Sequence, residues 1–416
     1  MIVEQIKYRA TGIHWTPEIP ENWEQMRLKN ICDDRLQYGI NVPSSKYSDD
    51  GIRFLRTTDI DEDGNIIDEG IYIPKDEVEQ SYLLQQGDLL FSRSGTVGRC
   101  YIHNTDNVYS YAGFLVRFRP ENKLLSKWMF YYSFTKEFKY QVNSEALVST
   151  ISNFNGNKYA ALKLFFPKDN NELINILNYL DKKTKQVENF IEKKKQFIGY
   201  LKEQRQSIIN DAVSKGIDDN IKLKVSGIDW LPEISNNFSV SRLRFLCKIT
   251  TGGKNTEDRI DDGLYPFFVR SQTIEKINTY SYDGEAILTA GDGVGVGKVF
   301  HYINEKFDFH QRVYMFYDFI EGIDGEYLYN FIQNNFMKEV MLYNAKSTVD
   351  SLRLPMIKNF PVAFPSFEEQ KRIVKYIKEE TATIDKAIAK TELEIELIKE
   401  YKEALISEAV IGKKIA

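Results

Sequence analysis

The sequence contains one unit written twice. Residues 11–29, TGIHWTPEIPENWEQMRLK, recur at 226–244 as SGIDWLPEISNNFSVSRLR. Two later segments also correspond: FLRTTDI from Phe54 matches FVRSQTI from Phe268, and GDLLFSRSGTVGRCYI from Gly87 resembles GEAILTAGDGVGVGKVFHY from Gly284. Short apolar runs rich in β-branched and aromatic residues, separated by glycine, are typical of strands and tight turns. The repeat therefore predicts two similar, strand-rich globular units.

Each copy ends in a long segment with helical periodicity, from Glu172 to Val213 and from Glu369 to Val410. Apolar residues recur there at alternating spacings of three and four, and the two series match each other without a gap. A heptad seam of about six heptads, flanked by Lys and Glu, is typical of a coiled coil. The predicted seam positions are Val187, Ile191, Ile198, Leu201, Ile208, Ile384, Ile388, Ile395, Ile398 and Leu405. The alternative is two separate amphipathic helices, each packed on its own globular unit.

Connectivity then predicts the architecture. Because the second unit begins where the first helix ends, two paired helices must run antiparallel. The expected fold class is α+β, with two globular, strand-rich domains at opposite ends of an antiparallel two-helix coiled coil. At about 1.5 Å per residue the rod is roughly 60 Å long. The expected domains are residues 1–170 and 217–367, and the expected helices are 171–216 and 368–416.

Composition limits the class of protein. With 42% hydrophobic residues and 28% charged residues the chain is expected to be globular, and no apolar run is long enough for a membrane span. We therefore expect a cytoplasmic protein. Cys32, Cys100 and Cys247 form no CxxC pair, which favours reduced thiols. The formal net charge of −5 argues against a uniformly basic, DNA-coating surface but leaves room for a local basic groove.

Catalytic and cofactor motifs are not found in the sequence. The glycine cluster Gly291–Lys298 does not fit a phosphate loop, because position 292 is Asp and Lys298 is followed by Val299. The four histidines show neither a helical i,i+4 pair nor the spacing of metal ligands. We therefore expect that the chain itself contains no catalytic residue and binds no metal or cofactor.

The polar residues around the glycine turns are suited to nucleic-acid recognition. Gly87–Arg99 is predicted to form a strand, a polar turn and a second strand, with its polar side chains exposed. Arg, Ser and Thr suit base edges and phosphates, and glycine allows a close approach of the backbone. An ordinary hairpin with solvated arginines is the alternative. The candidate DNA-binding residues are Arg93, Ser94, Thr96, Arg99, Asn155 and Lys158 in the first copy, and Arg270, Gln272, Lys298, Lys346, Ser347 and Arg353 in the second.

Three motifs together resemble the specificity subunits of Type I restriction-modification enzymes. They are GIHWTPEIPENW at Gly12–Trp23, GDLLFSRSGTVGR at Gly87–Arg99 and FPSFEEQKRIV at Phe364–Val374. The resemblance covers essentially the whole chain, including the order of globular and helical segments. Three departures are local. Only Glu172 remains of the EEQ helix start in the first copy. In the second copy GDGVGVG replaces the SGTVG turn, and Phe238 stands where the first copy has Trp23.

This resemblance implies a function and partners. Each globular unit is expected to be a target recognition domain that reads one half of a bipartite site in double-stranded DNA, while the helices fix the spacer. Two methyltransferase subunits are expected to bind the chain and to supply the S-adenosylmethionine chemistry on adenine, with motor-nuclease subunits joining for cleavage. A coiled-coil protein scaffold without a DNA role is the alternative, and a fused restriction-methylation enzyme is disfavoured because its motifs are missing.

Overall fold

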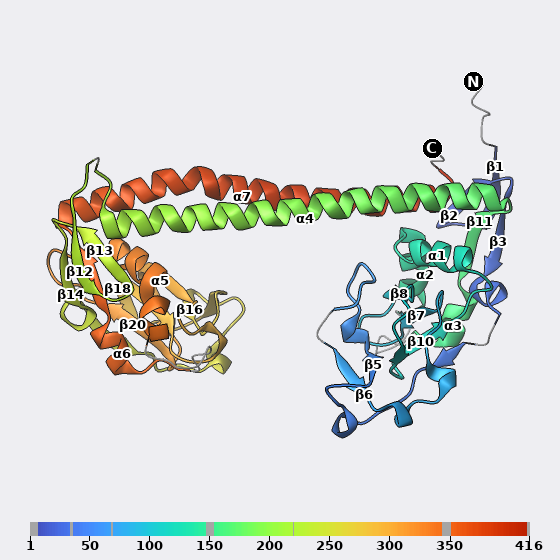
Figure 1. Ribbon diagram of the computed structural model, residues 1–416, viewed down its shortest axis with the longest axis horizontal. Helices are drawn as coiled ribbons and strands as arrows, with labels where there is room; N and C mark the ends of the chain where they lie inside the picture. The colour runs from blue at the N-terminus through green and yellow to red at the C-terminus, as the bar shows by residue number, and fades with distance from the viewer. Residues whose placement is uncertain are drawn as a thin grey trace. The chain divides into compact units, whose positions relative to one another are not determined.

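The computed structural model describes residues 7–33, 36–67, 70–146, 154–218, 220–342 and 351–413 (Figure 1). The chain divides into two compact units. Unit 1 contains the residues up to Lys194 together with those from Leu393, and unit 2 contains Lys195–Glu392. Each unit therefore combines a strand-rich domain with part of both long helices. The predicted α+β class, with two strand-rich domains and two long helices packed together, is confirmed.

Unit 1 is built from short strands and three helices ahead of the first long helix. Two hairpin-like pairs, β1–β2 and β3–β11, accompany a four-stranded sheet of order β4-β10-β7-β8 and a three-stranded sheet of order β6-β5-β9. The bounds are β1 Tyr8–Ile13, β2 Thr16–Pro20, β3 Trp23–Arg27, β4 Gln37–Tyr38, β5 Ile52–Leu55, β6 Ile71–Ile73, β7 Leu89–Ser92, β8 Cys100–Ile102, β9 Tyr109–Tyr111, β10 Leu115–Phe118, α1 Lys123–Tyr132, α2 Lys136–Ala146, α3 Gly156–Ala161 and β11 Lys163–Pro167.

Unit 2 repeats this plan with longer strands. The pairs β12–β13 and β14–β21 correspond to β1–β2 and β3–β11, and the remaining strands form one six-stranded sheet of order β15-β20-β18-β19-β16-β17. The bounds are β12 Leu223–Ile228, β13 Leu231–Ser235, β14 Ser239–Arg242, β15 Lys248–Thr251, β16 Tyr265–Phe268, β17 Glu275–Ile277, β18 Tyr282–Ala290, β19 Phe300–Phe309, β20 Val313–Tyr317, α5 Gly325–Leu342, α6 Leu354–Asn359 and β21 Pro361–Phe364.

Different side chains perform the same structural task in the two cores. In unit 1 the buried Trp128 of α1 donates its indole N–H to the Phe165 carbonyl of β11, at 2.9 Å. In unit 2 the buried Tyr327 of α5 donates its hydroxyl to the Ala363 carbonyl of β21, at 2.8 Å. Both bonds satisfy the polar end of a large aromatic side chain that otherwise fills the core. Each helix is thus fixed against the last strand of its domain.

The long helices are α4, Asn170–Lys215, and α7, Phe367–Val410. Their apolar residues lie at heptad spacing, so each helix presents a continuous apolar stripe. In unit 1 the ion pairs Glu188–Lys402, at 3.2 Å, and Lys194–Glu394, at 2.6 Å, show that the helices run antiparallel. The structure buries Val187, Ile198, Ile384, Ile395 and Leu405 of the predicted seam, and it partly buries Ile191, Leu201, Ile208, Ile388 and Ile398.

A glutamate at the start of each long helix ties that helix to the repeated hairpin motif. Glu172 of α4 accepts hydrogen bonds from the Asn22 amide, at 2.7 Å, and from the Trp23 indole, at 2.9 Å. Glu369 of α7 accepts the equivalent bond from the Asn237 amide, at 2.7 Å. Phe238 has no indole N–H, so the second copy keeps only one of the two bonds. This contact gives a structural reason why Glu172 survives in a copy that lost the rest of its EEQ motif.

The buried seam gives the first prediction. Ile198→Asp and Ile395→Asp each place a carboxylate at a position that is less than a tenth exposed, and should lower the free energy of unfolding by at least about 3 kcal/mol. The exposed Lys202 of α4 provides a matched control, because Lys202→Asp should stay within about 0.5 kcal/mol of the wild type. Urea unfolding monitored by circular dichroism measures all three. Equal midpoints for the three variants would contradict a packed seam.

The helix-start glutamates give a second prediction. Glu172→Ala removes two hydrogen bonds to a carboxylate and leaves the indole N–H of the buried Trp23 without its acceptor. The free energy of unfolding should therefore fall by about 2–3 kcal/mol. Glu369→Ala removes one bond from an exposed amide and should cost about 1 kcal/mol. Thermal unfolding of both full-length variants compares the two losses. A larger loss for Glu369→Ala would show that the indole bond contributes nothing.

Candidate nucleic-acid interface

Both units contain the same backbone junction, where three distant segments meet. In unit 1 the Arg93 N–H donates to the Phe114 carbonyl, at 3.0 Å, and the Arg93 carbonyl accepts from the Phe154 N–H, at 2.9 Å. In unit 2 the equivalent bonds join Gly291 to Arg312, at 2.8 Å, and Leu352 to Gly291, at 2.7 Å. We call each junction, with its side chains, the loop corner of its unit. The backbone is the same in the two corners, whereas the side chains differ.

The corner of unit 1 holds one arginine between aromatic rings. The Arg93 guanidinium lies 4.9 Å from the ring centre of Tyr38 and 5.9 Å from that of Phe114. The strand pairing of β4 with β10 brings Tyr38 opposite Val116, two residues after Phe114. Stacking against aromatic faces restricts the plane of a guanidinium and leaves its N–H groups available at the edge. Phe114 is 55% exposed, so the corner also presents an apolar ring to solvent.

The other predicted residues of the first copy surround this corner. Ser94, Thr96 and Arg99 are half-buried, as is Arg93 itself, which differs from the expected exposure. The reason for Arg99 is that its guanidinium donates to the Ile60 carbonyl, at 2.7 Å, and lies 3.7 Å from Glu62. A phosphate contact by Arg99 therefore has to share the guanidinium with these partners. Asn155 caps α3 by accepting from the Lys158 N–H, at 3.1 Å, and the Lys158 ammonium lies 5.7 Å from the Phe154 ring.

The corner of unit 2 holds two arginines on one carboxylate. Arg270 and Arg312 donate to opposite oxygens of Asp292, at 2.9 and 2.6 Å. Burial of the Asp292 carboxyl group raises its pKa, but the hydrogen bonds and charges of the two arginines outweigh burial and hold the pKa below its usual range. Burial, and then repulsion by the same two arginines, lowers the pKa of His310, whose Nδ1 accepts from the Arg312 N–H at 3.0 Å. Both guanidinium groups remain substantially exposed.

The remaining predicted residues of the second copy lie near this corner or outside the described residues. Gln272 donates to the Lys298 carbonyl, at 3.1 Å, and the Lys298 side chain is exposed. Arg353 is exposed and immediately follows Leu352, which bonds to the corner. Lys346 and Ser347 lie outside the described residues.

Sequence reasoning missed Tyr38, Phe114 and Arg312. A signal was present: Phe114 and Arg312 lie at the same distance along the chain from Arg93 and Gly291, respectively, so aligning the repeat through these turns pairs them. Tyr38 has no such signal, because only the pairing of β4 with β10 places it beside the corner.

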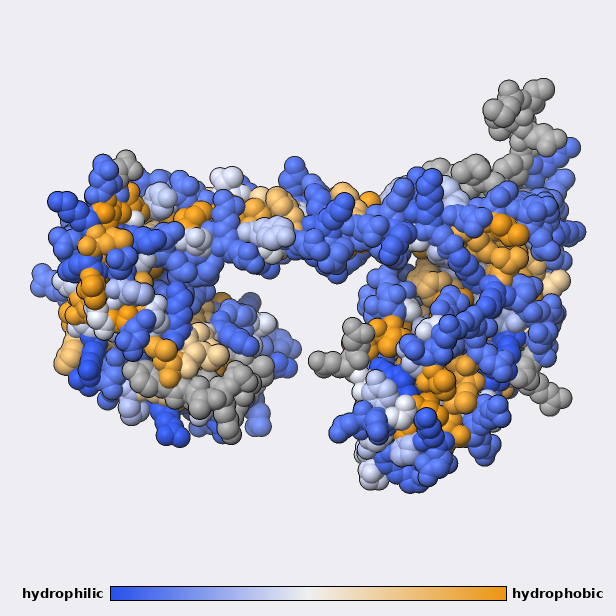
Figure 2. Space-filling model, viewed as in Figure 1, coloured by the Kyte–Doolittle hydropathy of each residue, from blue (hydrophilic) through white to orange (hydrophobic). Residues whose placement is uncertain are grey.

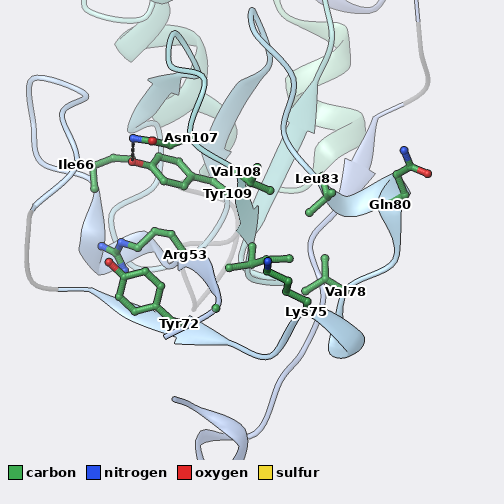
Figure 3. Close-up of a pocket in the computed structure, with 12 residues that line it drawn as sticks. Arg53, Ile66, Tyr72, Lys75, Val78, Gln80, Leu83, Asn107, Val108 and Tyr109 are labelled. Atoms are coloured by element: carbon green, nitrogen blue, oxygen red, sulfur yellow. Dashed lines mark hydrogen bonds between the residues drawn. The ribbon is translucent and has the colours of Figure 1, made fainter. Parts of the chain in front are cut away.

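A cavity of about 800 Å³ lies beside the three-stranded sheet of unit 1 (Figure 3). Its polar lining includes Arg53, which is already engaged by the carbonyls of Ile67 and Ile71, each at 3.2 Å, and by Asp59, at 3.5 Å. Asn107 donates to the Tyr109 hydroxyl at 3.5 Å. The arginine therefore serves the fold.

Three further observations concern the described part of the chain. It contains no cluster of His, Cys, Asp and Glu that could hold a metal ion. Burial raises the pKa of the Cys32 and Cys247 thiols to about 12, which keeps them protonated. None of the helices described here is long and apolar enough to span a bilayer.

A sequence profile for the Type I restriction modification DNA specificity domain matches residues 20–196 and 236–397. The chain belongs to this family. Among Type I specificity proteins it is similar to the Type I restriction enzyme EcoDI specificity subunit of Escherichia coli, with 29% identity over 168 residues. That alignment covers 40% of this chain and 36% of the relative, so the match spans about a third of the relative's length.

One solved structure shares the fold of this chain. A chain from a structure that addresses complex assembly and conformational transition of the type I R-M system has a TM-score of 0.67 at 13% identity, covering 95% of this chain and 99% of that chain. The HsdS subunit of Thermoanaerobacter tengcongensis has a TM-score of 0.45 at 13% identity, with 95% and 98% covered. The first likeness covers nearly the whole chain and therefore includes both copies of the repeat.

Proposed function

We propose that this chain acts in the cytoplasm as the DNA specificity subunit of a Type I restriction-modification complex. In this proposal residues 1–170 and 217–367 are target recognition domains, each reading one half of a bipartite site in double-stranded DNA. Helices 171–216 and 368–416 set the spacer between the half-sites. The observation that carries the proposal is the pair of loop corners, which share a backbone but present different polar groups. Such a pattern is expected when the framework keeps the fold and the loops read different bases.

The corner chemistry suits direct readout in a groove. An arginine can donate two parallel bonds to guanine, and an exposed apolar ring can contact the methyl group of thymine. In the first domain Arg93, which lies against the Tyr38 ring, provides the two donors, and Phe114 beside it provides the exposed apolar ring. In the second domain Asp292 orients Arg270 and Arg312, so two donors are held in a fixed relation. The proposed contacts around these corners are Ser94, Thr96, Arg99, Asn155 and Lys158 in the first domain, and Gln272, Lys298, Lys346, Ser347 and Arg353 in the second.

The partners in this proposal are two methyltransferase subunits, with motor-nuclease subunits joining the assembled complex. The long helices carry exposed apolar side chains (Figure 2). These side chains support the proposal that a protein partner binds to the helices. In unit 1 they are Ile174, Phe190, Leu393, Leu397 and Tyr401, and in unit 2 they are Phe197, Tyr200 and Phe367. Large exposed apolar groups at several positions of one helix are typical of an interaction surface. The chemistry on adenine and its S-adenosylmethionine belong to the methyltransferase subunits in this proposal.

Matched arginine variants test the DNA function. The full-length chain, reconstituted with its methyltransferase subunit, first selects duplexes from a randomised pool, and a bipartite site should emerge. Arg93→Ala should then lose about 1–3 kcal/mol of discrimination at one base pair of one half-site. Arg312→Ala should do the same in the other half-site only. Binding to duplexes with single changes in either half measures both effects.

The variants control for each other, because each removes one arginine from the corner of a different domain. A change of selectivity in both halves after either substitution would contradict the division between domains. Selection of no preferred sequence by the wild-type complex would favour a protein scaffold without DNA recognition.

Stoichiometry provides an independent test. A duplicated chain presents two similar helical surfaces, so two copies of one methyltransferase subunit should bind each chain. Native mass spectrometry of the reconstituted complex at increasing methyltransferase concentration should show a plateau at two to one. Saturation at one to one would refute the proposed use of both copies.

A further inference from the structure

A pair of basic residues stands at the same place in both copies of the repeat, outside the loop corners. Arg27 and Lys29 flank the buried Leu28 at the end of β3, and Arg242 and Arg244 flank the buried Leu243 at the end of β14. All four basic side chains are exposed. The three residues just before each pair are Glu-Gln-Met in the first copy and Ser-Val-Ser in the second. The basic character therefore persists where neighbouring strand positions have diverged.

The backbone places each basic pair next to a loop corner. The Leu28 N–H donates to the Leu162 carbonyl, and the Leu243 N–H donates to the Phe360 carbonyl, both at 2.9 Å. Leu162 and Phe360 directly follow α3 and α6, the six-residue helices whose preceding segments bond to the corners. At 1.5 Å per residue, each basic pair is separated from its corner by a helix about 9 Å long. This spacing is comparable with the width of a DNA groove, about 12 Å for the major groove.

The charge of these pairs is not neutralised within the described residues. None of the four basic groups has a carboxylate partner there, whereas Arg270 and Arg312 share Asp292. Arg242 and Arg244 both donate to the neutral Asn359 side chain, at 3.1 and 2.8 Å. Their shared acceptor fixes two guanidinium groups side by side without removing their charge. Each unit therefore carries two exposed basic groups without an ion-pair partner among the described residues.

We propose that the two basic pairs, Arg27–Lys29 and Arg242–Arg244, contact the DNA phosphate backbone beside each half-site. The inference rests on the proposed function. Phosphate contacts position a protein on the duplex without reading sequence, which explains why the same charge is kept in both copies while the corners differ. In this proposal the corners read the bases, and the basic pairs position the protein on the duplex.

An acidic protein surface is the rival occupant. Glu339 lines the same cavity as Arg242 and Asn359, but its carboxylate accepts from the Trp230 indole and forms no ion pair with either arginine. Two copies of the proposed methyltransferase subunit would also meet an equivalent site in each copy, so it is the position of each pair next to a corner proposed to read bases that favours DNA.

Charge-neutral variants test the inference in the reconstituted full-length complex. Arg27→Ala with Lys29→Ala, and Arg242→Ala with Arg244→Ala, should each lower the slope of log affinity against log salt by about one to two. At 0.1 M salt the affinity should fall roughly tenfold for each basic group that no longer reaches a phosphate. The decrease should be equal for the selected duplex and for duplexes with one changed base pair, so the selectivity ratio stays constant.

Two controls separate this effect from a general loss of charge or of structure. Lys222→Ala with Lys224→Ala removes the same charge from exposed positions at β12 and should leave the salt slope unchanged. Arg242→Lys with Arg244→Lys keeps the charge and should retain most of the slope.

Unchanged slopes in both alanine pairs would overturn the inference while leaving the proposed function intact. Loss of methyltransferase binding with an unchanged salt slope would assign the surface to a protein instead. A wild-type complex that selects no site would instead remove the proposed function.

Discussion

The packing of α4 against α7 is the constraint on which both globular domains depend. The main core of unit 1 includes Ile176 and Leu177 from the start of α4, and Ile406 and Val410 from the end of α7. The main core of unit 2 uses the equivalent residues with the roles exchanged. They are Ile209, Ala212 and Val213 from the end of α4, and Ile373, Val374 and Ile377 from the start of α7. Neither domain can complete its core with one helix alone, so the antiparallel pair is part of each folding unit.

The duplicated design creates a pairing problem, because each domain could in principle dock on the wrong pair of helix ends. One ion pair distinguishes the copies. In unit 1 Lys127 of α1 pairs with Asp181 of α4, and in unit 2 Glu326 of α5 pairs with Lys378 of α7, with the charges reversed. Exchange of the domains would bring like charges together at both positions. Partly exposed ion pairs contribute at most about 1 kcal/mol each, so this reversal adds selectivity to an association that apolar burial drives.

The periodic parts of this fold were predictable from the sequence, because a repeat and a heptad seam are local patterns that survive without knowledge of contacts. Arg93 and Arg270 were also found, since Arg93 lies next to a glycine turn and Arg270 lies in the repeated segment that begins at Phe268. The aromatic and arginine partners of these arginines were not found, because pairing between strands that are distant in the sequence brings them in. Arg99 shows the same limit: its hydrogen-bond acceptor is the carbonyl of Ile60, 39 residues away, and no local pattern indicates that bond.

The acidic net charge of the chain is compatible with DNA recognition when affinity and specificity have separate sources. At the corner of unit 2, Asp292 reduces the charge of the two arginines from +2 to +1, and so weakens their general attraction to phosphate. In return the carboxylate holds both guanidinium groups in one geometry, and orientation is what base readout requires. Long-range attraction then has to come from groups without a carboxylate partner. The basic pairs at β3 and β14 satisfy that condition, and they lie outside the corners, so they can act on the backbone while the corners address the bases.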